Sequence, residues 1–164
     1  LLPDHVACND GDPCTLDRCD PERGCQHLDQ CPDCREAAAS VPILWPPNHT
    51  LREIGVTGVA DPQGQEITIQ IDRILQDEPT DARGDGNTCP DARGVGQSTA
   101  FVRAERSGTP KQPGNGRIYL IMFTASDPDG YFCQGEVQTC VPHDLGFRSQ
   151  CIDDLIRFDS SSCH

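Results

Sequence analysis

Cysteine placement constrains this chain more than any other feature. The 164 residues contain 11 cysteines, and six of them lie within the first 34 residues among Asp, Gly and Pro. Such a segment cannot build a hydrophobic core, so cross-links, bound metal or docking onto a larger body must order it. Thiols at this density persist as disulfides only in an oxidising compartment. We therefore expect a protein that is secreted, extracellular or at the cell surface.

Alternating apolar residues predict β-structure in the rest of the chain. Residues 67–71 alternate Ile with Thr and Gln, 51–59 and 100–105 alternate more weakly, and 135–141 alternates again. Both faces of 117–125 are apolar, as expected for a central strand of a sandwich. The nearest approach to a helical apolar repeat, residues 151–158, would form one helical turn or a final strand.

These patterns divide the chain into four parts. Residues 1–36 are a disulfide-rich, Asp-rich appendage, 37–47 a linker or first extended segment, 48–145 a β-sandwich and 146–164 a cysteine-bearing tail. The predicted fold class is all-β, an antiparallel sandwich of about six strands. Residues 76–97 show no secondary-structure signal, and a loop of that length is usually functional or disordered.

Charge and composition exclude several functions. The formal net charge is −13, which would repel the phosphate backbone, so we expect no nucleic-acid partner. The longest apolar stretch, 118–125, is far too short to cross a bilayer, so we expect no membrane insertion. The chain has no G-x-S-x-G motif and no Cys/His protease signature, and we expect it not to be an enzyme.

Two stretches resemble known extracellular modules. Residues 8–27, CNDGDPCTLDRCDPERGCQH, resemble the Cys/Asp-rich short repeats of large secreted and extracellular-matrix proteins. Residues 42–144 contain PILWPPNHTL, QDEP, GDGNTCPD, RAER, GNGRIYLIMFTASD and CVPHD, and are similar to immunoglobulin-like modules of the hyalin-repeat kind in secreted and surface-attached bacterial proteins. The resemblance implies an immunoglobulin-like antiparallel β-sandwich in an adhesive or structural setting, and no particular reaction.

An acidic loop is the strongest chemical signal. Its candidate calcium ligands are Asp77, Glu78, Asp81, Asp85, Asn87 and Asp91. Ca²⁺ takes six to eight oxygen ligands, and Gly84 and Gly86 permit the tight turns that would gather them. The alternative is a solvated acidic loop. Glu105, between Arg103 and Arg106, would either add a ligand or form a salt bridge.

The appendage holds a second candidate calcium site. Its members are Asp10, Asp12, Asp17 and Asp20. Carboxylates this close repel one another unless a cation neutralises them, and a cation would also supply the order that a missing core cannot. The alternative is that each Asp caps its own backbone in a turn.

Ten cysteines are expected to form disulfides. They are Cys8, Cys14, Cys19, Cys25, Cys31, Cys34, Cys89, Cys133, Cys140 and Cys151. We expect the first six to pair locally, Cys89 to pair with Cys133, and Cys140 with Cys151. That assignment leaves Cys163 for an intermolecular bridge.

The two histidines in Pro-containing bends, His49 and His143, are expected to make structural hydrogen bonds. Trp45, the only tryptophan, is expected to anchor the core or a neighbouring unit.

We therefore expect a non-enzymatic extracellular structural protein, calcium-stabilised and self-associating as a homo-oligomer, fibre or surface layer. The alternative is a calcium-dependent adhesin or carbohydrate-binding module whose partner is a glycan or cell surface. A secreted enzyme or protease inhibitor is the least supported reading.

Overall fold

Antiparallel strands make up the regular structure of the chain. The computed structural model describes residues 8–109, 111, 114–146 and 151–163. These residues contain no α-helix, and therefore no helix that could span a membrane. The strands are β1 (Thr15–Asp20), β2 (Gly24–Asp29), β3 (Ala38–Ala39), β4 (Leu51–Ile54), β5 (Val56–Thr57), β6 (Thr68–Gln76), β7 (Ala92–Arg93), β8 (Ala100–Arg103), β9 (Arg117–Ser126), β10 (Phe132–Val141) and β11 (Phe158–Asp159).

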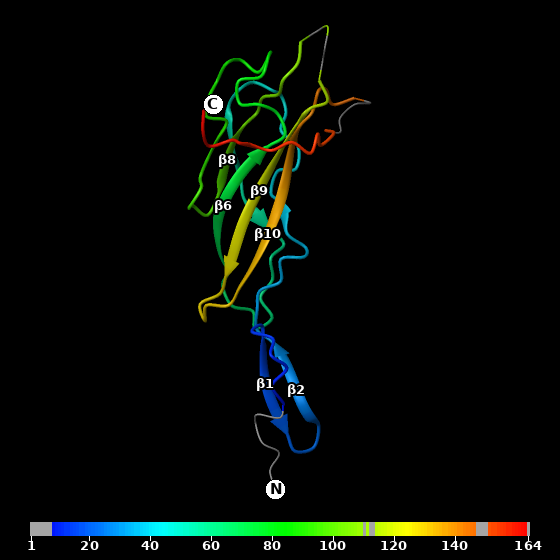
Figure 1. Cartoon of the computed structure of the whole chain (residues 1–164), viewed down its shortest axis with the longest axis vertical. Helices are drawn as coiled ribbons and strands as arrows, with labels where there is room; N and C mark the ends of the chain where they lie inside the picture. Colours follow the sequence, from blue (N-terminus) through cyan, green and yellow to red (C-terminus); the bar gives the residue numbers. More distant parts are fainter. Residues whose placement is uncertain (1–7, 110, 112–113, 147–150, 164) are drawn as a thin grey trace.

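The main sheet has the order β10-β9-β6-β11, with β9 between its two long neighbours (Figure 1). Every pair in it is antiparallel, and a β-bulge between Ile71 and Arg73 shifts the register of β6 against β9. The three strands predicted over 67–71, 117–125 and 135–141 therefore form this sheet. The all-β prediction is confirmed.

A second antiparallel sheet, β4-β8-β7, packs against the first and encloses the core. The chain predicted to be one strand over 51–59 divides at Gly55 into β4 and β5. The core consists of Leu44, Ile54, Ile71, Ile74, Ala92, Ala100, Val102, Ala104, Tyr119, Ile121, Phe123, Ala125, Val137 and Val141. Two sheets that share one interior in this way are consistent with a β-sandwich.

One open side of the sandwich is closed by residues 33–44. In this segment β3 pairs with β5, and Ile43 forms a parallel bridge with Cys140 on β10. Its start is fixed by the disulfide between Cys34 and Cys133, whose Cα atoms are 6.0 Å apart. The residues expected as a linker or first extended segment are thus paired with strands on both sides of the seam.

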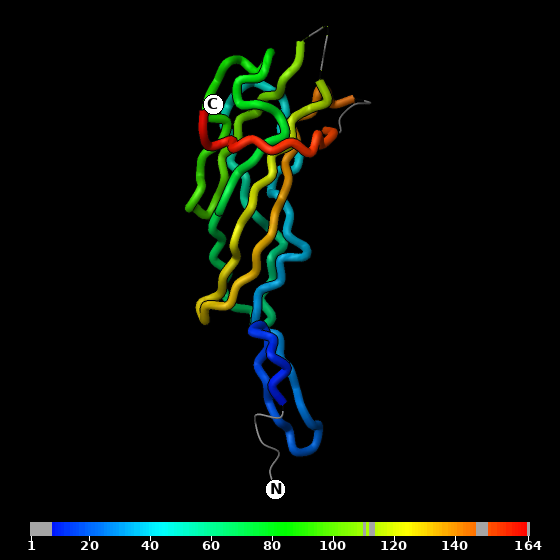
Figure 2. The backbone as a smooth tube through the Cα atoms, viewed as in Figure 1, coloured from blue at the N-terminus to red at the C-terminus, as the bar shows by residue number. Residues whose placement is uncertain are grey.

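The opposite side is closed by residues 151–163, which we call the strap. It crosses the end of the main sheet, where β9 begins (Figures 1 and 2). Ser160 joins both sheets, because its N–H donates to Ile74 at 3.0 Å and its carbonyl accepts the N–H groups of Asp91 and Ala92 at 3.0 and 2.8 Å. Residues 151–158 therefore contain no helical turn, and the final strand is short.

Both ends of the strap are disulfide-bonded. Cys151 pairs with Cys140, as predicted, and Cys163 pairs with Cys89. The predicted Cys89–Cys133 bridge is wrong, and so is the intermolecular role of Cys163. The strap returns the tail to the acidic loop, which brings Cys163 beside Cys89, while the chain leaving the appendage runs along β10 and brings Cys34 beside Cys133.

The appendage is a two-stranded hairpin, β1 and β2, that projects from the end of the sandwich opposite the strap (Figure 1). Its disulfides join Cys8 to Cys25 and Cys14 to Cys31. Cys19 belongs to none of the five disulfides, so local pairing of all six appendage cysteines is wrong. The reason is that Cys34 lies beyond the hairpin, on the seam of the sandwich.

Candidate functional site

The acidic loop folds over the end of the sandwich at which the strap crosses. Four of its carboxylate side chains are buried, at Asp77, Glu78, Asp85 and Asp91. Next to them lies Arg117, which begins β9 and has 0% of its surface exposed. Because a buried guanidinium is stable only when paired, the loop and the strand must be considered together.

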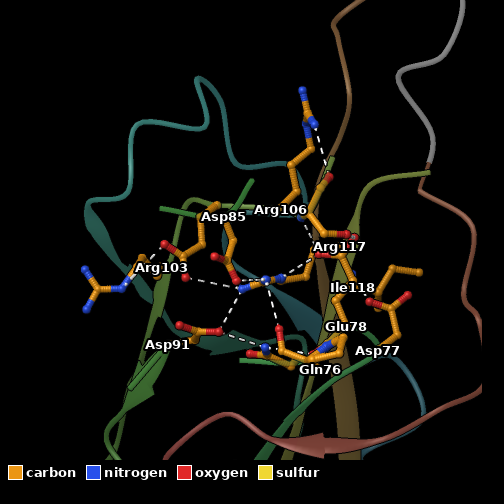
Figure 3. A network of polar contacts seen from close by, with 12 residues as sticks. Gln76, Asp77, Glu78, Asp85, Asp91, Arg103, Arg106, Arg117 and Ile118 are labelled. Atoms are coloured by element: carbon orange, nitrogen blue, oxygen red, sulfur yellow. Dashed lines mark hydrogen bonds and ion pairs between the residues drawn. The ribbon is translucent and has the colours of Figure 1, made fainter. Parts of the chain in front are cut away.

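Arg117 lies at the centre of the acidic side chains (Figure 3). Its Nε donates to Glu78 at 2.9 Å, and its Nη1 donates to Asp91 at 2.8 Å and to Glu105 at 3.4 Å. Nη2 lies 3.5 Å from Oδ2 of Asp85. Carboxylates from the acidic loop and from the segment that follows β8 are thus held by one side chain.

Tyr119 fixes the guanidinium from the interior. Its hydroxyl accepts a hydrogen bond from Arg117 Nη1 at 3.2 Å and donates to the carbonyl of Arg103 at 2.9 Å. Burial raises the pKa of Tyr119, so the phenol stays neutral. Burial opposes the charge of Arg117, but Tyr119 and Glu78 outweigh it and raise the pKa of Arg117. The cluster therefore keeps a permanent positive charge at its centre.

Glu105 links this cluster to the surface. Its Oε2 accepts the hydroxyl of Thr88 and lies 3.2 Å from Nδ1 of His49 and 3.8 Å from Nε of Arg103. His49 has a φ of +64°, and its ring packs against Gly86, where an added Cβ would be 2.8 Å from Cε1. Of the two roles considered for Glu105, the structure shows the salt bridge, with Arg103 and Arg117.

Negative charge exceeds positive charge in the cluster. Within the part of the chain that is described, Asp85 Oδ2 and Asp91 Oδ1 are buried without a hydrogen-bond donor. Burial and, to a smaller extent, the adjacent carboxyl of Glu105 together raise the pKa of Asp91 to about 7. Burial likewise raises the pKa of Asp77 to about 6. A proton or a second cation would relieve this excess.

Only part of the predicted calcium-ligand set converges. Glu78, Asp85 and Asp91 meet, but on Arg117. Asp77 points elsewhere and accepts the N–H of Ile118 at 2.9 Å. The remaining two, Asp81 and Asn87, are exposed. Calcium binding by this loop stays a prediction.

Arg117 was missed by the sequence analysis, although the sequence carried a signal for it. It opens the most apolar strand of the chain, RIYLIMFTA. A charged residue in a strand that is buried on both faces needs an opposite charge nearby, and the acidic loop was the largest source of such charge.

The hairpin contains a second cluster of polar side chains. His27 Nδ1 lies 2.5 Å from Asp17 Oδ1 and 3.2 Å from Asp10 Oδ2. The hydrogen bond with Asp17 raises the pKa of His27. Of the four predicted ligands here, Asp10 and Asp17 meet and Asp12 and Asp20 do not. The sequence analysis did not identify His27, because its contact with Asp17 depends on the register of β1 against β2, which is not apparent from the sequence.

Asp12 and Asp20 instead accept hydrogen bonds from backbone N–H groups two or three residues further along the chain. Asp12 accepts the N–H of Cys14 at 2.8 Å, and Asp20 accepts the N–H groups of Glu22 and Arg23, each at 2.9 Å. These two residues follow the turn-capping alternative.

The remaining candidates have structural contacts. His143 Nδ1 lies 3.0 Å from Asp144 Oδ2, and the His143 carbonyl accepts a hydrogen bond from Arg106. Trp45 is 37% exposed, so it is not a core anchor.

Apolar surface is present at both ends of the molecule. On the hairpin, Leu16 and Leu28 are directly opposite each other and are 52% and 47% exposed. Beside the strap, an open cavity of about 340 Å³ is lined by residues that include Pro42, Ile43 and Ile118.

Comparison with known proteins gives one partial match. A family model described as a Dictyostelium (slime mold) repeat matches residues 7–29. That stretch covers the hairpin and its first disulfide. Cysteine-rich repeats and many disulfides are typical of extracellular or secreted proteins. No curated protein and no solved structure matches the chain.

Proposed function

We propose that the chain is a non-enzymatic extracellular structural module whose copies associate head to tail. The hairpin of one copy would bind the apolar cavity of the next. The same proposal includes the more specific family, an immunoglobulin-like module of the hyalin-repeat kind. The motif GNGRIY contains Arg117, and the motifs QDEP, GDGNTCPD and RAER supply its carboxylate partners. This supports a structural role for the motifs.

The observation that carries the proposal is the separation of two apolar surfaces. Leu16 and Leu28 are exposed on the hairpin, which projects from one end of the sandwich (Figure 1). Ile43 lines the cavity that Cys151 of the strap also lines. Contacts between two different surfaces of identical chains propagate unless they close into a ring. Contiguous exposed apolar patches mark sites of protein–protein interaction, whereas apolar side chains scattered singly do not.

Covalent locking supports a mechanical role. The disulfides Cys34–Cys133 and Cys89–Cys163 fix one seam each, with sequence separations of 99 and 74 residues. Cross-links over long separations reduce the entropy of the unfolded chain most. A unit closed on both sides in this way would transmit force without opening.

Two variants test the head-to-tail arrangement. Leu16→Ser with Leu28→Ser removes the apolar hairpin surface, and Ile43→Asp disables the cavity. We expect the unmodified chain to form concentration-dependent polymers in sedimentation velocity and each variant to be monomeric. An equimolar mixture of the two variants should stop at dimers, because one intact hairpin meets one intact cavity.

The matched control is Leu155→Ser, which alters an exposed aliphatic side chain on the strap outside the cavity. It should polymerise like the unmodified chain. If the unmodified chain is a monomer at every concentration, the proposal is refuted. Calcium-dependent binding to a glycan array by that monomer would favour the adhesin alternative.

A further inference from the structure

Three potential metal ligands converge on one face of the hairpin. Asp17 on β1 and His27 on β2 are directly opposite each other in the strand register, and Asp10 approaches from the preceding loop. Their ligand atoms, two carboxylate oxygens and the imidazole Nδ1, all lie within 4.8 Å of one another. Because side chains alternate along a strand, this face is opposite the one that carries Leu16 and Leu28.

Hydrogen bonds aim both carboxylates at the imidazole. Asp10 Oδ1 accepts the N–H of Asp12 and the hydroxyl of Thr15, each at 2.9 Å, which leaves Oδ2 directed at His27. Asp17 Oδ2 accepts the N–H of Asp10 at 3.1 Å, which leaves Oδ1 directed at the same nitrogen. Partners that orient ligands in this way are typical of metal sites in proteins.

Disulfides hold the three elements together. Cys8–Cys25 joins the chain just before Asp10 to β2, and Cys14–Cys31 joins the chain just after it to the end of the hairpin. The loop that bears Asp10 is therefore tied to the strands at both ends. The ligands meet at little additional entropic cost, which is the condition for appreciable affinity in a small site.

We propose that Asp10, Asp17 and His27 bind a divalent cation of the Zn²⁺ class. Neutral imidazole suits Zn²⁺, Cu²⁺ and Ni²⁺, whereas Ca²⁺ and Mg²⁺ select oxygen ligands. Binding at Nδ1 would release to solvent the proton that this nitrogen shares with Asp17. Ligand bonds of about 2.0 Å in tetrahedral geometry separate neighbouring ligand atoms by about 3.3 Å. The Asp10–His27 distance of 3.2 Å already matches, and the Asp17–His27 distance of 2.5 Å needs only a small outward movement of the carboxylate. The exposed side would be completed by water.

The test is calorimetric titration of the oxidised full chain with ZnCl₂, after removal of metal by chelator. We expect one site whose affinity falls at least tenfold in His27→Gln and in Asp17→Asn. Co²⁺ added to the unmodified chain should give visible absorption that His27→Gln abolishes. Disulfide mapping of each variant should show Cys8–Cys25 and Cys14–Cys31, so that loss of binding is not loss of the hairpin.

Matched controls separate this site from other ligands. Asp29→Asn alters an acidic residue on the same hairpin outside the cluster, and His143→Gln alters another His–Asp pair. Both should bind Zn²⁺ like the unmodified chain. Unchanged Zn²⁺ affinity in His27→Gln would overturn the proposal, as would binding lost in Cys19→Ser but retained in His27→Gln. Absence of heat with Zn²⁺ at millimolar concentration would also overturn it.

Discussion

Arg117 and Asp91 form an ion pair of 2.8 Å in which neither side chain has any exposed surface. Residue 91 ends the acidic loop and residue 117 begins the central strand β9, so this contact joins the acidic loop to the main sheet. Burying two charges is costly unless geometry and additional hydrogen bonds compensate, and here Gln76 also donates to Asp91 at 2.8 Å. The loop is ordered by this buried network.

Stability should fall as the pH rises from about 5 to about 8. Burial raises the pKa of Asp91 to about 7 and that of Asp77 to about 6, so in this range the folded chain binds more protons than the unfolded chain. The free energy of unfolding then decreases with pH. Urea denaturation in chelator at pH 5, 6, 7 and 8 measures the slope. Asp91→Asn should flatten this slope, and Asp72→Asn, at an exposed residue, should not. A free energy of unfolding that increases with pH would contradict the raised pKa values of Asp77 and Asp91.

Gly84→Ala should destabilise the chain more than Gly64→Ala. Both glycines have positive φ, +97° and +73°, so both substitutions carry the backbone cost of about 1 kcal/mol. Only at Gly84 would the new Cβ meet a backbone atom, the carbonyl oxygen of Gly108 at 2.0 Å. The difference between the two midpoints of urea denaturation isolates the packing of the acidic loop. Equal midpoints would mean that the loop is not held against residue 108.

Removing the strap disulfides should cost different amounts. Cys140–Cys151 spans 11 residues and Cys89–Cys163 spans 74. Loop-closure entropy predicts losses of about 3 kcal/mol for the short loop and about 4.5 kcal/mol for the long one. Paired Cys→Ala variants measured by urea denaturation test this order. A larger loss from the short loop would show that the strap stabilises the native state by other means.

Calcium binding by the acidic loop has a separate test. If Ca²⁺ neutralises the excess charge around Asp85 and Asp91, 2 mM CaCl₂ should raise the melting temperature above that in chelator. Ligand at 100 times its Kd stabilises a protein by about 2.7 kcal/mol. Asp85→Asn should abolish the shift and the exposed Asp81→Asn should preserve it. An equal melting temperature with and without calcium would contradict calcium binding, and the positive charge in the acidic loop would then come from Arg117.

The sequence predicted the long strands of the main sheet well because apolar patterns report directly on burial, but it did not predict β1 and β2 of the hairpin. The alternating pattern of residues 67–71 overlaps the start of β6, and the apolar run 117–125 lies in β9, as expected. It predicted contacts poorly wherever they depend on how distant segments meet. Cys163 reaches Cys89 only because the strap crosses the sheet, and no local pattern in the tail indicates that path.

The same limit applies to the clusters. The acidic residues were recognised as needing a positive partner, but one carboxylate looks like another in a sequence, and spacing alone does not distinguish a metal from a guanidinium. Arg117 lies 26 residues from Asp91 in sequence, and its role depends on β9 starting beneath the loop. Asp17 and His27 likewise meet only through the register of the hairpin.

The most direct test of the structural account is the free energy of unfolding of Arg117→Met against Arg93→Met, a matched change at an exposed arginine on β7. Removing one partner from a buried ion pair costs about 3–5 kcal/mol, because it leaves uncompensated charge in the interior. Tyr119→Phe removes the hydroxyl's hydrogen bonds to the guanidinium and to the Arg103 carbonyl. It should cost about 1–3 kcal/mol and remains measurable if Arg117→Met does not fold. We predict a loss of at least 3 kcal/mol, or failure to fold, for Arg117→Met and less than about 0.5 kcal/mol for Arg93→Met. Equal stabilities of the two variants would contradict the account.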